Sequence, residues 1–189
     1  MQYLQTDELL RVMGEAKKAG AREHCMFLLA YRHGLRATEI SRLTVADVRG
    51  GNINVRRLKG SLHTVQALQT HANQLLDEKR SLAAWLTERG DADGSAILFT
   101  SRQGSGLSRR QVYNLFNDIA FRAGIEAGRR NPHILKHSLA SHLIRHGANV
   151  AYVQQALGHA DPKSTLSYTH ITQTEASAVV SNVMNAVFA

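Results

Sequence analysis

The segment HILKHSLASHL, residues 133–143, places basic and proton-carrying side chains among its leucines. A helix repeats about every 3.6 residues, so His133, Lys136 and His137 would share one face. Leu135 and Leu139 would point away from that face. Lysine and histidine side chains can neutralise an anion, and histidine also carries protons near neutral pH. The segment therefore predicts a helix with a core face and a chemically active polar face.

A zinc site is the first alternative for this helix. His133 and His137 have the spacing of the histidines in H-E-x-x-H zinc sites. The residue after the first histidine is isoleucine rather than a glutamate base, and Lys136 would repel a metal cation. We therefore expect no metal here. His142 and His146, which follow on the other side of the helix, are interpreted as packing or surface histidines.

Other residues of similar chemistry are spread along the chain in suggestive contexts. Arg36 follows a helix-ending glycine in HGLRATEI, Lys59 occupies a turn, and His159 precedes Tyr168 by nine positions. Each of these residues, considered alone, could have an ordinary structural role. Arg36 could pair with Glu39 at i, i+3, the lysine could be solvated, and the tyrosine could be half-buried. Their order and local contexts, taken together, are more informative.

Composition and charge limit the classes of function. The formal net charge is +8, which is typical of a surface that meets a polyanion such as DNA or RNA. The start of the chain, MQYLQTDELL, lacks the basic and apolar regions of a signal peptide, and no apolar run approaches the ~18 residues of a membrane span. Cys25 is the single cysteine and lies in an apolar run, which indicates a buried free thiol. We expect a cytoplasmic protein that does not enter a membrane.

Helical spacing and turn residues predict most of the secondary structure. Ser108 is expected to cap the helix that follows it, and Gly34 and Gly158 are expected to end helices. From Val45 onward, Gly-Gly and Lys-Gly-Ser turns separate short β-prone runs, which indicates a small antiparallel meander with Lys59 at a hairpin tip. The expected helices cover residues 6–18, 22–33, 37–43, 70–88, 109–122, 133–146 and 150–157, with a short strand at 96–100.

Several segments together resemble the motif boxes of the tyrosine recombinase, or phage integrase, catalytic domain. They are YRHGLRATEISRL, a hairpin lysine, HILKHSLASHLIRHGANVAYVQQALGH and STLSYTH, and the resemblance runs from about residue 4 to 175. It implies a mainly α fold with a small antiparallel β-sheet (α+β), in a single catalytic domain over residues 1–189. A tail helix at about 172–188 would dock on a neighbouring subunit or fold back on its own domain.

Larger members of this family also carry an N-terminal core-binding domain that completes a clamp around DNA. The chain starts where the catalytic domain usually starts, so we expect no core-binding domain in it. The sequence is then either a piece of a longer protein or similar to the short fimbrial-type inversion recombinases.

The family pattern is arginine, lysine, histidine-x-x-arginine, histidine or tryptophan, and tyrosine, in that order. This sequence departs from the pattern at Lys136, which stands where the family has its second arginine. A lysine cannot make the bidentate contact of an arginine, so we expect Lys136 to hold a phosphate less rigidly. The residues at the catalytic places of the family are Arg36, Lys59, His133, Lys136, His159 and Tyr168.

The resemblance implies cleavage of a DNA phosphodiester by Tyr168. A tyrosine hydroxyl has an ordinary pKa of about 10, so it needs a base or a strong positive field to attack at neutral pH. Arg36 would grip the non-bridging oxygens, with Lys136 and the second histidine adding charge. His133 would accept the tyrosine proton and Lys59 would protonate the 5′-oxygen. The bond energy is kept in a 3′-phosphotyrosyl link, so the resemblance implies no ATP, metal or other cofactor.

Basic side chains around this centre are expected to contact a double-stranded DNA site, although a solvated basic face is the alternative for each of them. The family also implies a tetramer on DNA, accessory DNA-bending proteins and a place at the nucleoid. Two rival functions stay open: a type IB topoisomerase, and a catalytically dead DNA-binding relative, which Lys136 makes credible. The expected phosphate contacts are Arg102, Arg109, Arg110, Arg129, Arg130 and Arg145.

Overall fold

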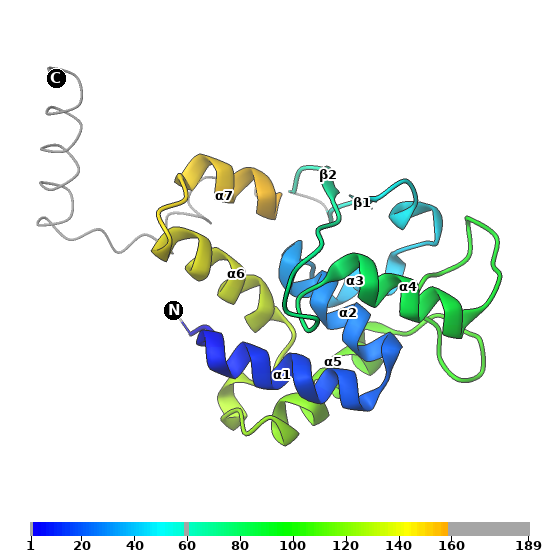
Figure 1. Ribbon diagram of the computed structural model, residues 1–189, viewed down its shortest axis with the longest axis horizontal. Coiled ribbons are helices and arrows are strands. Elements are labelled where there is room, and N and C mark those ends of the chain that lie inside the picture. The colour runs from blue at the N-terminus through cyan, green and yellow to red at the C-terminus, as the bar shows by residue number, and fades with distance from the viewer. Residues whose placement is uncertain (1, 59–60, 159–189) are drawn as a thin grey trace, which may run out of the picture.

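The computed structural model describes residues 2–58 and 61–158 (Figure 1). This part of the chain is mainly helical with a two-stranded antiparallel sheet, as the sequence predicts. None of its helices is long and apolar enough to cross a membrane. The helices and strands are α1 (Thr6–Ala19), α2 (Ala21–Arg32), α3 (Ala37–Arg42), β1 (Asn52–Val55), β2 (Thr64–Ala67), α4 (Glu78–Arg89), α5 (Arg109–Arg122), α6 (His133–Arg145) and α7 (Val150–Leu157), with 3-10 turns at Ala46–Val48 and Ala127–Arg129.

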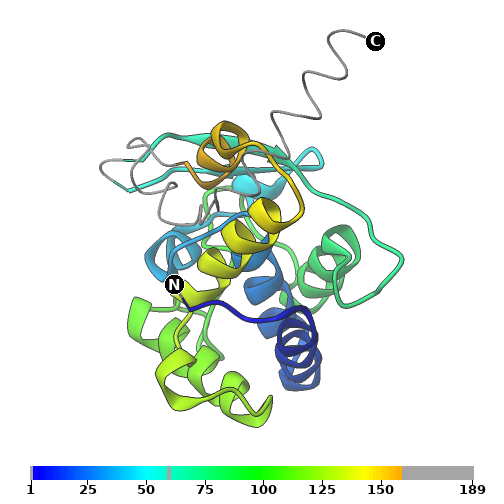
Figure 2. The same ribbon diagram turned by 90° about the vertical axis from the view of Figure 1, so that its left-hand side faces the viewer.

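Helix α2 forms the centre of the fold. Every residue from Glu23 to Ala30 is buried, and α2 packs against α1, α4 and α6. A helix buried on all sides needs apolar residues on every face, which the run CMFLLA supplies. Cys25 lies in this run as a fully buried free thiol, as predicted. Figures 1 and 2 show α1 and α5 on one side of this centre, and the β-hairpin with α7 on the opposite side.

The meander predicted from Val45 is reduced to a single antiparallel hairpin of β1 and β2, because Ala46–Val48 form a 3-10 turn instead. Side chains alternate between the two faces of a strand. Ile53 and Val55 accordingly lie in the core. The side chain of Arg57, two residues further on, is also fully buried. Strand β2 contacts α7, so the hairpin carries a buried arginine toward that helix.

The helix predicted over residues 70–88 begins only at Glu78. Asp77 caps it, because its Oδ1 accepts a hydrogen bond from the backbone N–H of Arg80 (3.0 Å). Before this cap, Oδ1 of Asn73 accepts a hydrogen bond from the backbone N–H two residues further on (3.0 Å). Such local side-chain bonds compete with helix formation, so helical spacing alone overestimated the length of α4.

Residues 96–100, predicted as a strand, form only isolated β-bridges. Side chains of α4 donate hydrogen bonds to the backbone carbonyl groups of this segment. Nε1 of Trp85 donates a hydrogen bond to the carbonyl of Leu98 (3.0 Å), and Arg89 donates to the carbonyls of Leu98 (3.1 Å) and Ile97 (2.7 Å). These donors take the acceptors that a neighbouring strand would use.

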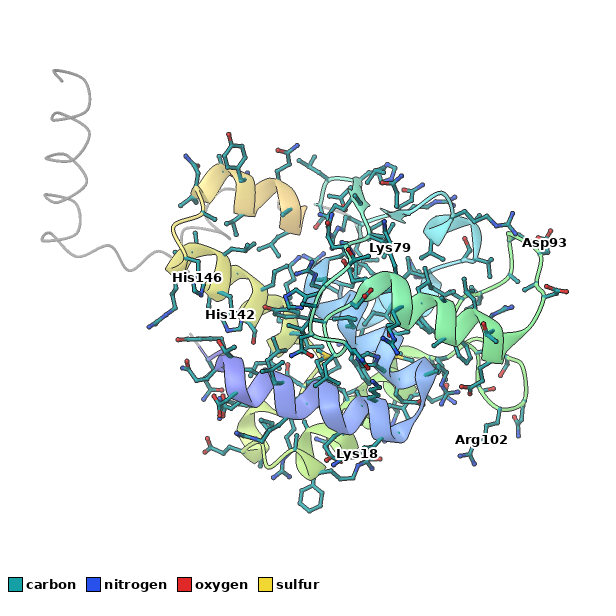
Figure 3. The ribbon with its side chains drawn as sticks, viewed as in Figure 1. Lys18, Lys79, Asp93, Arg102, His142 and His146 are labelled. Atoms are coloured by element: carbon teal, nitrogen blue, oxygen red, sulfur yellow. The ribbon has the colours of Figure 1, made fainter. Side chains whose placement is uncertain are left out.

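Leu4 fastens the N-terminal segment to α6. Its backbone N–H donates to Oγ of Ser138 (2.8 Å), and its carbonyl accepts a hydrogen bond from Nε2 of His142 (2.9 Å). Nε2 therefore carries the proton, and Nδ1 of His142 accepts from the hydroxyl of Tyr31 (2.9 Å). His142 is thus a packing histidine and His146 an exposed one, as predicted; Figure 3 shows both near the end of α6.

Candidate active site

Arg36 stands at the turn between α2 and α3. Gly34 makes this turn with a φ of +58°, and a Cβ atom there would lie 2.6 Å from Cδ2 of Leu157, so the position favours glycine. Nη1 of Arg36 donates hydrogen bonds to Oε1 of Glu39 (3.0 Å) and Oγ of Ser61 (3.1 Å). The side chain is still 31% exposed. The guanidinium group is therefore fixed through Nη1, and part of the Arg36 side chain stays exposed.

Glu39 is the buried acceptor at the centre of this cluster. Its carboxylate accepts hydrogen bonds from the backbone N–H of Arg36 (2.8 Å), from the Arg36 side chain and from Nη1 of Arg57 (3.3 Å). Burial would raise the pKa of Glu39, but the Arg36 N–H and the surrounding cations outweigh it, so the pKa lies below its ordinary value. Glu39 is therefore ionised and balances one of the cations around it.

Lys136 lies in the first turn of α6 and is only 1% exposed. Its Nζ donates a hydrogen bond to the carbonyl oxygen of Leu157, the last residue of α7 (2.9 Å). The sequence predicted a polar face shared with His133 and His137, but the end of α7 covers Lys136 instead. Burial, followed by the charges of two neighbouring arginines, lowers the pKa of Lys136 to about 7. This amine can therefore gain or lose a proton at neutral pH.

His133 and His137 face each other on α6, with ring centroids 4.4 Å apart and ring planes at 88°. They line a pocket of about 350 Å³ with Gln2, Asn131 and Ile134. Partial burial, then nearby cations, lowers the pKa of His133. Burial, then the charge of His133, lowers the pKa of His137 to about 4. Both rings are neutral at pH 7, which is the form that accepts a proton.

The profile of the phage integrase family matches residues 2–175 of the chain. The chain belongs to the phage integrase family. One relative is the type 1 fimbriae regulatory protein FimE of Escherichia coli K12, 40% identical over 158 residues that cover 79% of this chain and 75% of FimE. The tyrosine recombinase XerD of Agrobacterium fabrum is 34% identical over 172 residues, 85% of this chain and 52% of XerD.

Solved structures of the same family share the fold. The XerA recombinase is 26% identical with a TM-score of 0.74, over 96% of this chain and 63% of XerA. The XerH recombinase bound to its difH substrate is 24% identical with a TM-score of 0.79, over 96% of this chain and 54% of XerH. The chain thus spans about half of XerD and XerH. Family and relatives together identify a site-specific tyrosine recombinase that acts on DNA.

The structure brings together those residues of the predicted catalytic set that it describes. Arg36 comes from the start of α3 and the others from the first turn of α6, and the charge of Arg36 acts on both. Among the described residues, no three His, Cys, Asp or Glu side chains gather as metal ligands. Arg36, His133 and Lys136 are described, whereas Lys59, His159 and Tyr168 lie outside the described residues.

Sequence reasoning missed Arg57, the second arginine bound to Glu39. The sequence contained a signal for this residue, namely the alternation of buried and exposed side chains that continues from β1. Since Val55 faces the core, the residue two positions later is expected on the same side. A buried arginine needs partners for its whole guanidinium group, which would have marked Arg57 as part of a polar cluster.

The arginines expected to contact DNA divide into two groups. Arg129 is held inside the fold by Glu8 (Nη2 to Oε1, 2.5 Å), and Arg130 donates from Nε to a backbone carbonyl (2.6 Å). These bonds give both arginines a role within the domain. Figure 3 shows Arg102 at the opposite end of the molecule from His146. The exposed arginines of the predicted set are Arg102, Arg109, Arg110 and Arg145.

Proposed function

We propose that this recombinase cleaves and rejoins duplex DNA at specific sites through a transient phosphotyrosine bond. The observation that carries the proposal is the cluster at the α2–α3 turn and the first turn of α6. There Arg36, Arg57 and Lys136 surround the carboxylate of Glu39, with neutral His133 beside them. The excess of positive charge favours a bound phosphate, and the neutral ring can accept a proton.

In the proposed cleavage step, the proton that leaves the nucleophile has an acceptor, and the leaving oxygen has a proton donor. The hydroxyl oxygen of Tyr168 forms a bond to phosphorus while the bond from phosphorus to the 5′-oxygen breaks. His133 accepts the tyrosine proton, and Lys59 donates a proton to the departing 5′-oxygen. The products are a 3′-phosphotyrosyl link and a free 5′-hydroxyl. A 5′-hydroxyl from another strand can attack that link, which reverses the step without any outside source of energy.

The phosphate contacts of this centre are unequal. Arg36 binds the non-bridging oxygens through the nitrogens that Glu39 and Ser61 leave accessible. His159 adds a further hydrogen bond. Lys136 contributes its charge, but its Nζ is already bonded to the carbonyl of Leu157. The family's second phosphate-binding position is therefore weaker here than an arginine would make it.

The exposed arginines of α5 and its surroundings are the proposed contacts to the DNA backbone. Arg109 and Arg110 lie in the first turn of α5, where N–H groups also favour anions. Among the solved relatives, XerH is bound to difH, and a lambda integrase dimer is bound to a core site. We infer that the recombinase acts as a tetramer on DNA in the nucleoid, with its tail at 172–188 joining subunits and accessory proteins bending the site.

A covalent-trapping assay tests this function. The probe is a nicked duplex selected from a randomised pool by its binding to the protein, because a nick lets the cleaved end escape and traps the adduct. We expect a protein–DNA adduct mapped to Tyr168 that disappears in Tyr168→Phe. Tyr152→Phe is the matched control, since Tyr152 is a 72% exposed tyrosine on α7, and it should keep the adduct.

A DNA-binding relative without cleavage activity is the second candidate, because Lys136 is buried and bonded to a backbone carbonyl. Binding of the selected duplex without an adduct, in both the wild type and Lys136→Arg, would establish this candidate. Relaxation of a plasmid that lacks the selected site would instead indicate a topoisomerase.

A further inference from the structure

The side chain of Arg57 is completely buried beside Glu39. Its Nη2 donates hydrogen bonds to the backbone carbonyls of His33 (2.8 Å) and Ala156 (3.2 Å). Its Nη1 donates to the carbonyl of Gly34 (3.1 Å). Arg57 therefore bonds the turn that leads into Arg36 to the C-terminal end of α7.

The other N–H groups of Arg57 have side-chain acceptors. Nη1 also donates to Oε2 of Glu39 (3.3 Å), and Nε donates to Oγ1 of Thr64 on β2 (3.3 Å). Every N–H group of the guanidinium thus has an acceptor within the fold, which is the condition for burying this charge. Nothing on Arg57 is left to bind a substrate.

The C-terminal end of α7 is held through three consecutive carbonyl groups, those of residues 156 to 158. Such carbonyls have no partner within their own helix. Here they accept hydrogen bonds from other segments: Ala156 from Arg57 and from Nε2 of Gln66 (2.7 Å), Leu157 from Lys136, and Gly158 from the backbone N–H of Leu62 (2.9 Å). The helix end is therefore fixed relative to the hairpin and to α6.

The charges explain why a second arginine is needed. Glu39 is hydrogen-bonded to both Arg36 and Arg57. If Arg57 were absent, the carboxylate would cancel the charge of Arg36, and the pair would attract a phosphate weakly. With Arg57 present as the buried counterion, Arg36 keeps a net positive charge at its exposed edge.

We propose that Arg57 is a positioning residue of strand cleavage. It fixes the end of α7 against the Arg36 turn and neutralises Glu39, so that Arg36 presents an uncancelled charge to the phosphate. The proposal rests on the proposed function and adds to it a residue that does not touch the substrate. Lys59 follows Arg57 by two positions in the chain, and His159 follows Ala156 by three, so the same arginine also anchors the segments that lead to both.

The test compares Arg57→Lys and Arg57→Met with the wild type at saturating nicked duplex. Arg57→Lys keeps the charge but loses the planar fork, and Arg57→Met loses both. We expect the adduct to form more slowly in each, by a factor on the order of 10² for a misplaced centre, with the affinity for the duplex nearly unchanged. Arg89→Met is the matched control, because Arg89 also donates to backbone carbonyls, but those of residues 97 and 98.

A pH profile separates this role from simple loss of structure. The groups around Lys136 include Arg36, Arg57, Glu39 and His133, and the charge of Arg57 lowers the pKa of Lys136. The cleavage rate should fall at the pH where Lys136 loses its proton, and this fall forms the alkaline limb of the pH–rate profile. Arg57→Met should therefore move this limb to higher pH. That limb is identified by its disappearance in Lys136→Arg. Arg57→Lys and Arg89→Met should leave the limb where the wild type has it.

The outcomes are distinguishable. Circular dichroism gives the folded fraction of each variant, and rates are compared per folded molecule. Wild-type rates in Arg57→Lys would overturn the proposal even if Arg57→Met failed to fold. An equal loss in Arg89→Met would also overturn it, because the effect would then be general destabilisation. No adduct in the wild type would overturn the proposed function, and the role of Arg57 with it.

Discussion

The ammonium group of Lys136 lies 2.9 Å from the carbonyl oxygen of Leu157, and the lysine side chain is buried. The residue at the family's second arginine position is thus bonded to the end of a helix. Its pKa of about 7 follows from burial and from the arginines that surround it. Both the stability and the activity of this recombinase should therefore depend on the protonation of one lysine.

Lys136 should make the protein more stable as the pH rises above neutrality. Its pKa is about 7 in the fold and 10.5 ordinarily, so the unfolded chain binds more protons between these values. The free energy of unfolding should rise there by at most about 1.4 kcal/mol per pH unit. Urea denaturation between pH 7 and about 8, below the ordinary pKa of the Cys25 thiol, measures the slope, and Lys136→Met should reduce it. An identical slope in that variant would contradict the assignment.

Replacing Lys136 by arginine should speed strand cleavage. An arginine could keep one hydrogen bond to Leu157 and still offer further N–H groups to the phosphate. A donor of this kind is typically worth on the order of 10² in rate. Single-turnover adduct formation by Lys136→Arg provides the measurement. A rate no faster than that of the wild type would mean that the site is adapted to lysine.

Gly34 should tolerate alanine poorly. An alanine there would adopt a φ of +58° and place its Cβ 2.6 Å from the side chain of Leu157. Gly104→Ala is the control, because Gly104 also has a positive φ but has nothing within 4 Å of an added Cβ. The backbone strain of about 1–3 kcal/mol should appear in both variants, and the clash only in Gly34→Ala. Equal unfolding free energies for the two would show that α7 does not constrain the turn.

Removing the hydroxyl of Ser138 should loosen the N-terminal segment. Ser138→Ala would leave the buried N–H of Leu4 without its acceptor, at a cost of about 1–3 kcal/mol in unfolding free energy. Ser41→Ala is a fitting control, because its hydroxyl bonds only to the carbonyl of Thr38 within α3. Denaturant titration of both variants tests this. A loss in Ser41→Ala as large as in Ser138→Ala would argue against a special role for the Leu4 contact.

The parts of the fold that were predictable are those set by local chemistry. Oγ of Ser108 accepts a hydrogen bond from the backbone N–H of Gln111 (3.2 Å) at the expected start of α5. Gly158 ends α7 in the left-handed conformation, with a φ of +64°. Signals of this kind involve residues only a few positions apart, so they can be read directly from the sequence.

Burial set by distant segments was not predictable in the same way. The hydrogen bond from Arg57 to Ala156 joins positions 99 residues apart, and that from Lys136 to Leu157 joins positions 21 apart. Helical periodicity placed Lys136 on a polar face because it contains no information about what covers that face. The family pattern supplied the catalytic set, but it gave no indication of the buried arginine behind Glu39.

The seclusion of Cys25 has a practical consequence. Its thiol is fully buried in α2, and burial raises its pKa far above the ordinary range, so it offers no thiolate to a labelling reagent while the domain is folded. Since the chain has no other cysteine, a single cysteine introduced at an exposed position such as Tyr152 would carry a fluorophore selectively. Because Cys25 does not react in the folded domain, such a fluorophore would report on the assembly of the protein on DNA without background labelling.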